Sequence, residues 1–83
     1  MNIYIGNLDY GVDENDLRNI FEKYGSVSDV KIITDKYSGK SKGFGFVVIE
    51  NNSEANKAIS ELNGATLENR EIVVNEARPR KQY

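Results

Sequence analysis

The sequence of 83 residues contains no cysteine and no histidine. It therefore lacks the side chains for disulfides, for zinc sites built on these ligands, and for catalysis by a thiolate or an imidazole base. Its apolar runs are too short to span a bilayer, and acidic residues follow the N-terminus too closely for a signal peptide. We expect a cytoplasmic protein with no metal or other cofactor and no membrane partner.

Charge is not strongly biased overall, but it is unevenly distributed. The formal net charge is −2, which alone argues against an anionic partner. Residues 31–42 nevertheless carry four lysines against one aspartate, and residues 76–83 carry three cations against one glutamate. The length leaves room for one small domain, predicted over residues 1–78, followed by a short basic tail over 79–83. A nucleic-acid partner stays open.

Four segments are predicted to be β-strands, because apolar and polar residues alternate in them and turn-forming residues separate them. These segments are residues 2–6, 27–34, 43–50 and 71–77. The connection between the second and third segments is polar, and its Ser38-Gly39 pair predicts a hairpin turn.

Two amphipathic helices are predicted between these strands. The first is capped by Asp13 and Asp16 and ends at Gly25. The second is capped by Ser53 and ends at Asn63. Each has one apolar stripe at helical spacing, formed by Leu17, Ile20, Phe21 and Tyr24 in the first helix and by Ala55, Ala58, Ile59 and Leu62 in the second.

The resulting order, β-α-β-β-α-β, predicts a ferredoxin-like α+β fold with a four-stranded antiparallel sheet. Because each helix has a single apolar stripe, both helices are expected to pack on one face of the sheet. The opposite face is then left without a cover.

Aromatic residues are predicted to lie on this uncovered face. In the third strand, alternation places Gly45 and Val47 on the core side and Phe44 and Phe46 on the other. The glycine suits the side that the helices approach. Alternation in the first strand likewise directs Tyr4 outward. Three rings on one rigid face form an aromatic platform (Tyr4, Phe44 and Phe46) that suits stacking with nucleic-acid bases.

Two motifs on these strands carry a resemblance to a known family. Residues 42–49, KGFGFVVI, resemble the octamer of the RNA recognition motif, and residues 3–8, IYIGNL, resemble its hexamer. The octamer pattern is K/R-G-F/Y-G/A-F-V-x-F/Y. It is matched except at Ile49, which alternation places in the core. The resemblance covers residues 2–77. In its compact form the chain is similar to the short single-domain members of the family found in bacteria.

The resemblance implies a protein that binds single-stranded RNA, with roles for particular residues. Tyr4 and Phe46 would stack neighbouring bases, and Phe44 would lie against the sugars. Lys42 would meet a phosphate, and backbone groups around Asn75 to Arg78 would read base edges. The platform would be framed by Lys31, Ile33, Val73 and Asn75. An RNA strand that extends beyond the sheet would contact the hairpin-loop residues Lys36, Tyr37 and Lys40.

The strength of binding can be bounded from the size of the platform. Stacking contributes about 1–3 kcal/mol per base, so two stacked bases and a few further contacts predict a dissociation constant of roughly micromolar order. We expect modest sequence selectivity in a monomeric post-transcriptional regulator or RNA chaperone. The sequence does not separate RNA from single-stranded DNA.

Catalysis and protein docking are the two alternatives to RNA binding. Catalysis is not expected, because Val48 stands where a glycine-rich phosphate loop requires its next glycine and no nucleophile–base pair is evident. A protein-interaction module would instead dock a partner on the acidic helical face or on the aromatic sheet face. The sequence leaves that alternative open.

Overall fold

The computed structural model describes residues 1–39 and 41–77, with the backbone alone described at residues 41 and 42. The predicted elements are present, together with one further short hairpin. They are β1 (Asn2–Gly6), α1 (Glu14–Phe21), β2 (Val27–Thr34), β3 (Ser41–Ile49), α2 (Asn52–Leu62), β4 (Thr66–Leu67), β5 (Arg70–Glu71) and β6 (Val73–Glu76). The predicted boundary between a domain at 1–78 and a tail at 79–83 lies outside the described residues and stays a prediction.

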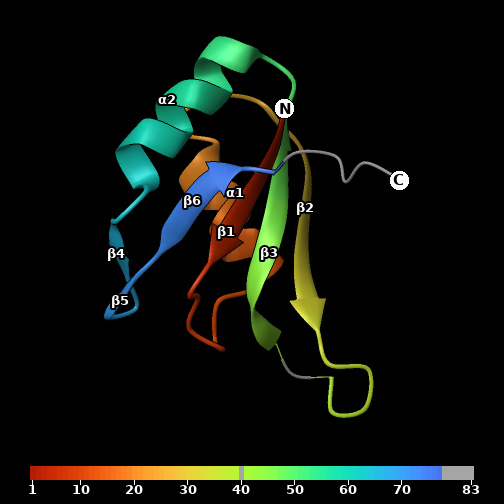
Figure 1. Cartoon of the computed structure of the whole chain (residues 1–83). Coiled ribbons are helices and arrows are strands. Elements are labelled where there is room, and N and C mark those ends of the chain that lie inside the picture. Colours follow the sequence, from red (N-terminus) through yellow and green to blue (C-terminus); the bar gives the residue numbers. More distant parts are fainter. Residues whose placement is uncertain (40, 78–83) are drawn as a thin grey trace, which may run out of the picture.

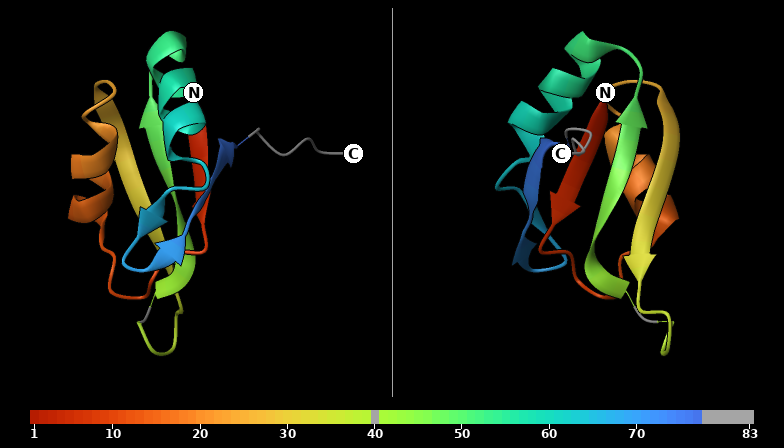
Figure 2. Two further views of the ribbon diagram at one scale, coloured as in Figure 1. Left: turned by 90° about the vertical axis from the view of Figure 1, so that its left-hand side faces the viewer. Right: turned by 45° about the vertical axis from the view of Figure 1, so that its right-hand side comes forward.

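The main sheet has four strands in the order β2-β3-β1-β6, and each neighbouring pair is antiparallel (Figure 1). Both helices lie on the same side of this sheet (Figure 2). Helix α1 packs mainly against β2, and α2 against β6 and β3. The predicted ferredoxin-like fold is therefore confirmed, including the face without helices.

The core lies between the sheet and the helices and is made of apolar side chains. In the part of the chain that the structure describes, no polar or charged side chain is buried. Ile49 is completely buried, so the departure from the family octamer lies in the core as predicted. Both the sheet and the helices contribute side chains to this core. They include Ile3, Ile5, Val47 and Val74 from the sheet and Leu17, Phe21, Ala55 and Ala58 from the helices.

The predicted capping of α1 is confirmed. Asp13 Oδ1 accepts a hydrogen bond from the Asp16 N–H at 2.9 Å, and Asp16 Oδ2 accepts one from the Asp13 N–H at 3.1 Å. The helix ends at Phe21, earlier than the predicted end at Gly25. The N–H groups of Tyr24 and Gly25 both donate to the Phe21 carbonyl, which closes the chain in a turn. Tyr24 still packs against the core.

The predicted cap of α2 is wrong. The N-cap is Asn51, whose Oδ1 accepts a hydrogen bond from the Glu54 N–H at 3.0 Å. Ser53 lies inside the first turn of the helix. Both residue types cap helices well, and the apolar stripe begins only at Ala55, so the pattern did not separate the two positions. The predicted end is confirmed, with Asn63 as C-cap and Gly64 at φ +85°.

The additional hairpin, β4–β5, divides the predicted last strand. Ile72 does not continue β5 into β6, because its N–H donates to the Ala65 carbonyl and its own carbonyl accepts from the Gly64 N–H, each at 2.9 Å. The last strand of the main sheet therefore begins at Val73 rather than at Glu71.

Asn7, the residue that follows β1, connects this hairpin to the main sheet. Asn7 Nδ2 donates to the Glu71 carbonyl at 2.7 Å, and Asn7 Oδ1 accepts from Arg70 Nη2 at 2.8 Å. Asn7 has a φ of 58°, a conformation that asparagine adopts more readily than most residues. The hexamer asparagine thus has a structural role.

Candidate nucleic-acid interface

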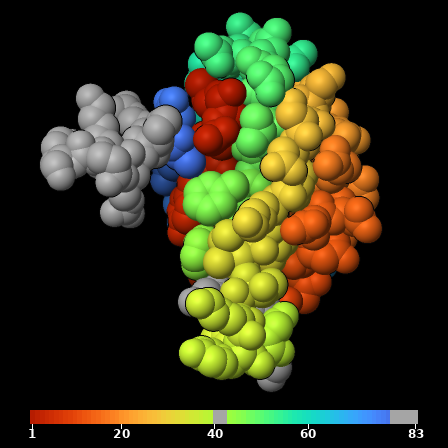
Figure 3. Space-filling view, turned by 90° about the vertical axis from the view of Figure 1, so that its right-hand side faces the viewer, coloured from red at the N-terminus to blue at the C-terminus, as the bar shows by residue number. Residues whose placement is uncertain are grey.

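A row of four residues crosses the sheet on the face without helices. Lys31 of β2 pairs with Phe46 of β3, Phe46 pairs with Tyr4 of β1, and Tyr4 pairs with Asn75 of β6. Directly opposed residues of an antiparallel sheet point to the same face. The pairing therefore places a cation, two rings and an amide side by side, as a cross-sheet row. Figure 3 looks onto this face, where β6, β1, β3 and β2 follow one another.

The three rings of the aromatic platform contact one another. Ring centroids are 5.9 Å apart for Tyr4 and Phe46, 6.1 Å for Tyr4 and Phe44, and 6.4 Å for the two phenylalanines. The interplanar angles of 62°, 37° and 88° are typical of tilted and edge-to-face pairs. Each side chain is only partly buried. The rings support one another while keeping ring surface accessible, on the face that the sequence predicted.

The absence of a side chain at Gly6 leaves the space that the Tyr4 ring occupies. The ring lies over Gly6, two residues further along β1, so that a Cβ atom on Gly6 would be 2.5 Å from the phenolic oxygen and 2.9 Å from Cε2. Any larger residue at this position would displace the ring. This role was not predicted from the sequence, although Gly6 follows Tyr4 at the two-residue spacing that places both on one face of the strand.

Gly45 lies on the core side, as predicted, but its close neighbour is a strand rather than a helix. A Cβ atom there would collide with the carbonyl oxygen of Lys31 and would lie 3.2 Å from the Cα of Ile32. The register of β2 and β3 shifts between Ile32 and Thr34. The absence of a side chain at Gly45 therefore permits β2 to approach β3 closely.

The residues predicted to frame the platform differ in exposure. Lys31 and Asn75 are exposed, whereas Ile33 is partly buried within the register shift of β2. Val73 is 40% exposed and lies opposite Gly6. The predicted cations Lys40 and Arg78 lie outside the described residues, as does the Lys42 side chain. In the hairpin loop, Lys36 is exposed and Tyr37 is 96% exposed.

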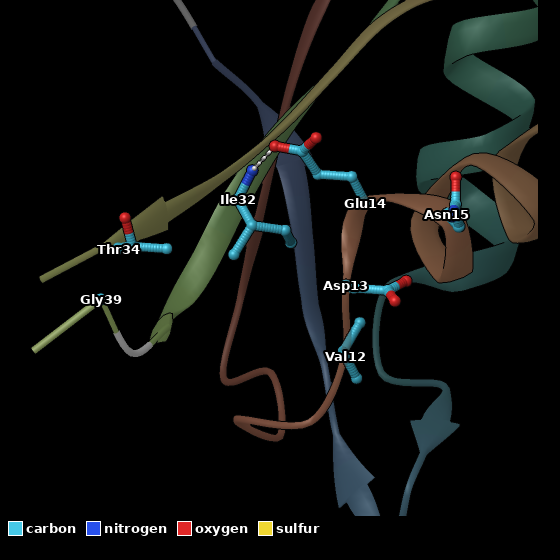
Figure 4. A pocket seen from close by; sticks show the side chains of 7 residues that line it. All are labelled: Val12, Asp13, Glu14, Asn15, Ile32, Thr34 and Gly39. Carbon is cyan, nitrogen blue, oxygen red and sulfur yellow. Dashed lines mark hydrogen bonds between the residues drawn. The ribbon is translucent and has the colours of Figure 1, made fainter.

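A hollow at the beginning of α1 offers a different kind of surface (Figure 4). Asp13 and Glu14 line it together with Ile32 and Thr34 of β2. Glu14 Oε2 accepts a hydrogen bond from the Ile32 N–H at 3.2 Å, so this carboxylate joins α1 to the edge strand (Figure 4). The acidic lining does not suit a phosphate.

Over residues 1–39 and 41–77, no group of three or more carboxylates is placed to hold a metal ion. Neither helix in this part of the chain has the length and apolar character needed to cross a lipid bilayer.

Comparisons with known proteins agree with this geometry. The family model described as the RNA recognition motif matches residues 3–73. The chain is 45% identical over 82 residues to the putative RNA-binding protein RbpE of Nostoc, covering 99% of this chain and 83% of that protein. A crystal structure of RNA Binding Protein PG1 superposes with a TM-score of 0.93 at 44% identity, covering 99% of both chains.

Longer relatives contain a similar segment. The chain is 49% identical over 84 residues to the chloroplast 29 kDa ribonucleoprotein of Arabidopsis thaliana, covering 98% of this chain and 25% of that protein. The chain spans between 25% and 29% of the length of three such chloroplast proteins.

Proposed function

The chain belongs to the RNA recognition motif family, a family of RNA-binding proteins rather than enzymes, and on that premise we propose that it binds single-stranded RNA on the aromatic platform. Tyr4 and Phe46 stack neighbouring bases, and Phe44 contacts the sugars between them. Rings stack with any base, because every base has a π-face. The proposed selectivity is therefore modest.

The cross-sheet row is the observation that supports this proposal most directly. Lys31, Phe46, Tyr4 and Asn75 come from four different strands, yet the strand register aligns them on one face. A base stacked on Phe46 then lies beside the Lys31 cation, and a base stacked on Tyr4 lies beside the hydrogen-bonding amide of Asn75. This combination suits a nucleotide, which presents a ring, a phosphate and polar base edges.

The polar members of the row and the other predicted site residues are proposed to contact the rest of the nucleotide chain. Lys31 and Lys42 meet phosphates, and Lys40 contacts the RNA where it extends beyond the sheet. Asn75 and the backbone as far as Arg78 read base edges. Ile33 provides apolar support at the β2 edge, where it is partly buried.

The proposed affinity is of roughly micromolar order, which corresponds to about −8 kcal/mol. Two stacked bases at about 1–3 kcal/mol each and a few phosphate contacts must offset the cost of ordering a flexible strand. We further propose a monomer in the cytoplasm that acts in post-transcriptional regulation or as an RNA chaperone. The chloroplast relatives are much longer than this chain. The activities of those full-length proteins are therefore not part of this proposal.

An NMR titration with a short RNA of mixed sequence tests the proposal. RNA stacked on the platform shifts the backbone signals of Tyr4, Phe44, Phe46 and their strand neighbours. A single-stranded DNA of the same sequence, titrated in parallel, measures the preference for ribose. Absence of shifts on the sheet at millimolar RNA would refute the proposed site.

The same titration addresses docking of a protein on the acidic helical face. Shifts confined to α1 and α2 would favour that alternative over RNA binding on the sheet. A protein partner that shifts the helices while RNA shifts the sheet would show that the two faces act independently.

A further inference from the structure

Strand β2 forms one outer edge of the main sheet. It pairs with β3 on its inner side, and in the described part of the chain no strand pairs with it on the outer side (Figure 1). With eight residues, it is longer than a usual strand of about five or six. The unpaired N–H and C=O groups of an edge strand can pair with a strand of another chain. The way these groups are satisfied therefore bears on self-association.

Two backbone N–H groups of β2 donate to carboxylates. The Ile32 N–H donates to Glu14 Oε2 at 3.2 Å, and the Val30 N–H donates to Asp29 Oδ1 at 3.0 Å. Figure 4 shows the Glu14 side chain reaching from the beginning of α1 to the Ile32 N–H. Residues two apart in an antiparallel strand direct their backbone groups to the same edge. The two carboxylates therefore cover successive donors along the outer edge of β2.

Ordered structure holds both the donors and the acceptors in place. Glu14 is the first residue of α1 and directly follows the N-cap Asp13. The side chains of Val30 and Ile32 belong to the core, with exposures of 8% and 9%. Because the backbone on both sides is already fixed by the fold, covering this edge requires little additional ordering.

The opposite edge of the main sheet is covered in a comparable way. The Val74 N–H of β6 donates to Asn63 Oδ1 at 3.0 Å. Just before this strand, the Ile72 N–H donates to the Ala65 carbonyl. Both outer strands therefore have N–H groups that are occupied by acceptors from outside the sheet ladder. Native sheets use such devices against edge-to-edge pairing.

A second copy of this chain is the partner that the outer edge of β2 fits. Two copies of one strand can pair antiparallel about a two-fold axis, so that Val30 of each copy lies opposite Ile32 of the other and every contact occurs twice. In that arrangement the Glu14 and Asp29 carboxylates would occupy the donors that the pairing needs. They would also bring like charges together across the axis, which is unfavourable.

We propose that Glu14 and Asp29 keep the outer edge of β2 closed to a second copy of this chain, and that removing both carboxylates permits an antiparallel β2–β2 dimer. The inference rests on the monomeric state within the proposed function, and it identifies the residues that maintain that state.

Sedimentation equilibrium of the double variant Glu14→Ala/Asp29→Ala tests the proposal. It should dimerise with a dissociation constant below about 1 mM, a weak affinity because one strand edge makes a small interface. The unmodified protein should stay monomeric over the same concentrations. Glu61→Ala/Glu68→Ala is the charge-matched control, because these exposed carboxylates lie in α2 and in the β4–β5 turn. It should stay monomeric.

A second double variant separates the hydrogen bonds from the charge. Glu14→Gln/Asp29→Asn removes both charges but keeps an oxygen acceptor at each position. It should therefore dimerise at least about ten-fold more weakly than the alanine variant. Equal dimerisation of the two variants would mean that charge alone keeps the copies apart, and it would overturn the proposed capping.

Two NMR measurements locate the effect. In a mixture of labelled and unlabelled alanine variant, intermolecular NOEs should connect Val30 of one copy with Ile32 of the other. Dimerisation without these NOEs would overturn the assignment to β2. In the unmodified protein, the Val30 and Ile32 amides should be protected from hydrogen exchange, whatever the alanine variant does. Exchange at the rate of an unstructured peptide would show that the caps do not form and would overturn the inference.

The outcomes keep this proposal distinct from RNA binding. If RNA shifts the platform signals while the alanine variant stays monomeric at about 1 mM, the proposed RNA site stands and the inference about β2 is wrong. If the alanine variant dimerises through β2 and RNA shifts nothing on the sheet, the inference stands without the RNA site. A β2–β2 dimer of the unmodified protein would overturn both the closed edge and the proposed monomer.

Discussion

Tyr4 and Gly6 share one face of β1, and the Tyr4 ring occupies the space where a Gly6 side chain would be. The hypothetical Cβ atom on Gly6 would lie 2.5 Å from the phenolic oxygen. The obstacle is the end of a side chain, which can move, rather than backbone. Gly6 therefore controls where the ring lies more than whether the strand forms.

We predict that Gly6→Ala yields a folded protein with weaker RNA binding. The added methyl group displaces the Tyr4 ring from its contacts with Phe44 and Phe46. Affinity should fall by about 1 kcal/mol, the lower end of the range for one stacked base. Fluorescence anisotropy measures the affinity, and thermal unfolding verifies the fold.

A double-mutant cycle shows whether Gly6 acts through the ring. Gly6→Ala is combined with Tyr4→Ala and compared with each single variant. If Gly6 acts only by placing the ring, its substitution costs nothing further once the ring is absent. Equal losses in both backgrounds would mean that the glycine contacts RNA itself.

Phe46→Ala should weaken RNA binding by about 1–3 kcal/mol while the domain stays folded. Phe46 lies in the cross-sheet row and is only partly buried. Val48→Ala is the matched control, because Val48 lies on the same face of the same strand but outside that row. Unfolding of Phe46→Ala would contradict the assignment of this ring to an accessible surface.

Salt should weaken binding only moderately. Two or three phosphate contacts to a single strand predict a slope of about −1.4 to −2.1 for the logarithm of the association constant against the logarithm of salt concentration. Titrations between low and physiological salt measure this slope. Lys31→Ala should make it shallower by about 0.7, whereas a slope unchanged by that substitution would remove Lys31 from the phosphate contacts.

Asn51→Ala should destabilise the domain by about 1 kcal/mol, the usual cost of losing an N-cap side chain. Its Oδ1 accepts the hydrogen bond from the Glu54 N–H at the start of α2. Ser53→Ala is the control and should change stability by less than about 0.5 kcal/mol. Urea unfolding measures both, and the reverse order of effects would restore Ser53 as the cap.

The sequence predicted the main strands well, because each combines a clear alternation with a requirement to bury one face. The bounds of β2 agree residue for residue with the predicted segment. The capping box at Asp13 and Asp16 was recognisable because reciprocal side chains need a fixed spacing. The facing of Tyr4, Phe44 and Phe46 followed from the same alternation.

Features that depend on contacts distant in sequence were not predicted. Strands β4 and β5 have two residues each, too few to show a periodicity. Their turn uses Glu68 and Asn69 at positive φ, and only Asn69 gives a recognisable turn signal. The break at Ile72 depends on its hydrogen bonds to Gly64 and Ala65. Likewise, the neighbour of Gly45 could be identified only once the register of β2 was known.

The cross-sheet row also has a consequence for when the protein becomes able to bind. Its members stand at positions 4, 31, 46 and 75, so a chain emerging from the ribosome has no complete row until β6 has been synthesised and has joined β1. On the proposed binding mode, bound RNA contacts all four strands at once, although these strands are distant from one another in the sequence. At a concentration one hundred times its dissociation constant, such a ligand adds about 2.7 kcal/mol to the folded state. The row is therefore complete only once its last strand has joined the sheet, and on the proposed binding mode RNA bound there would raise the temperature at which the domain unfolds.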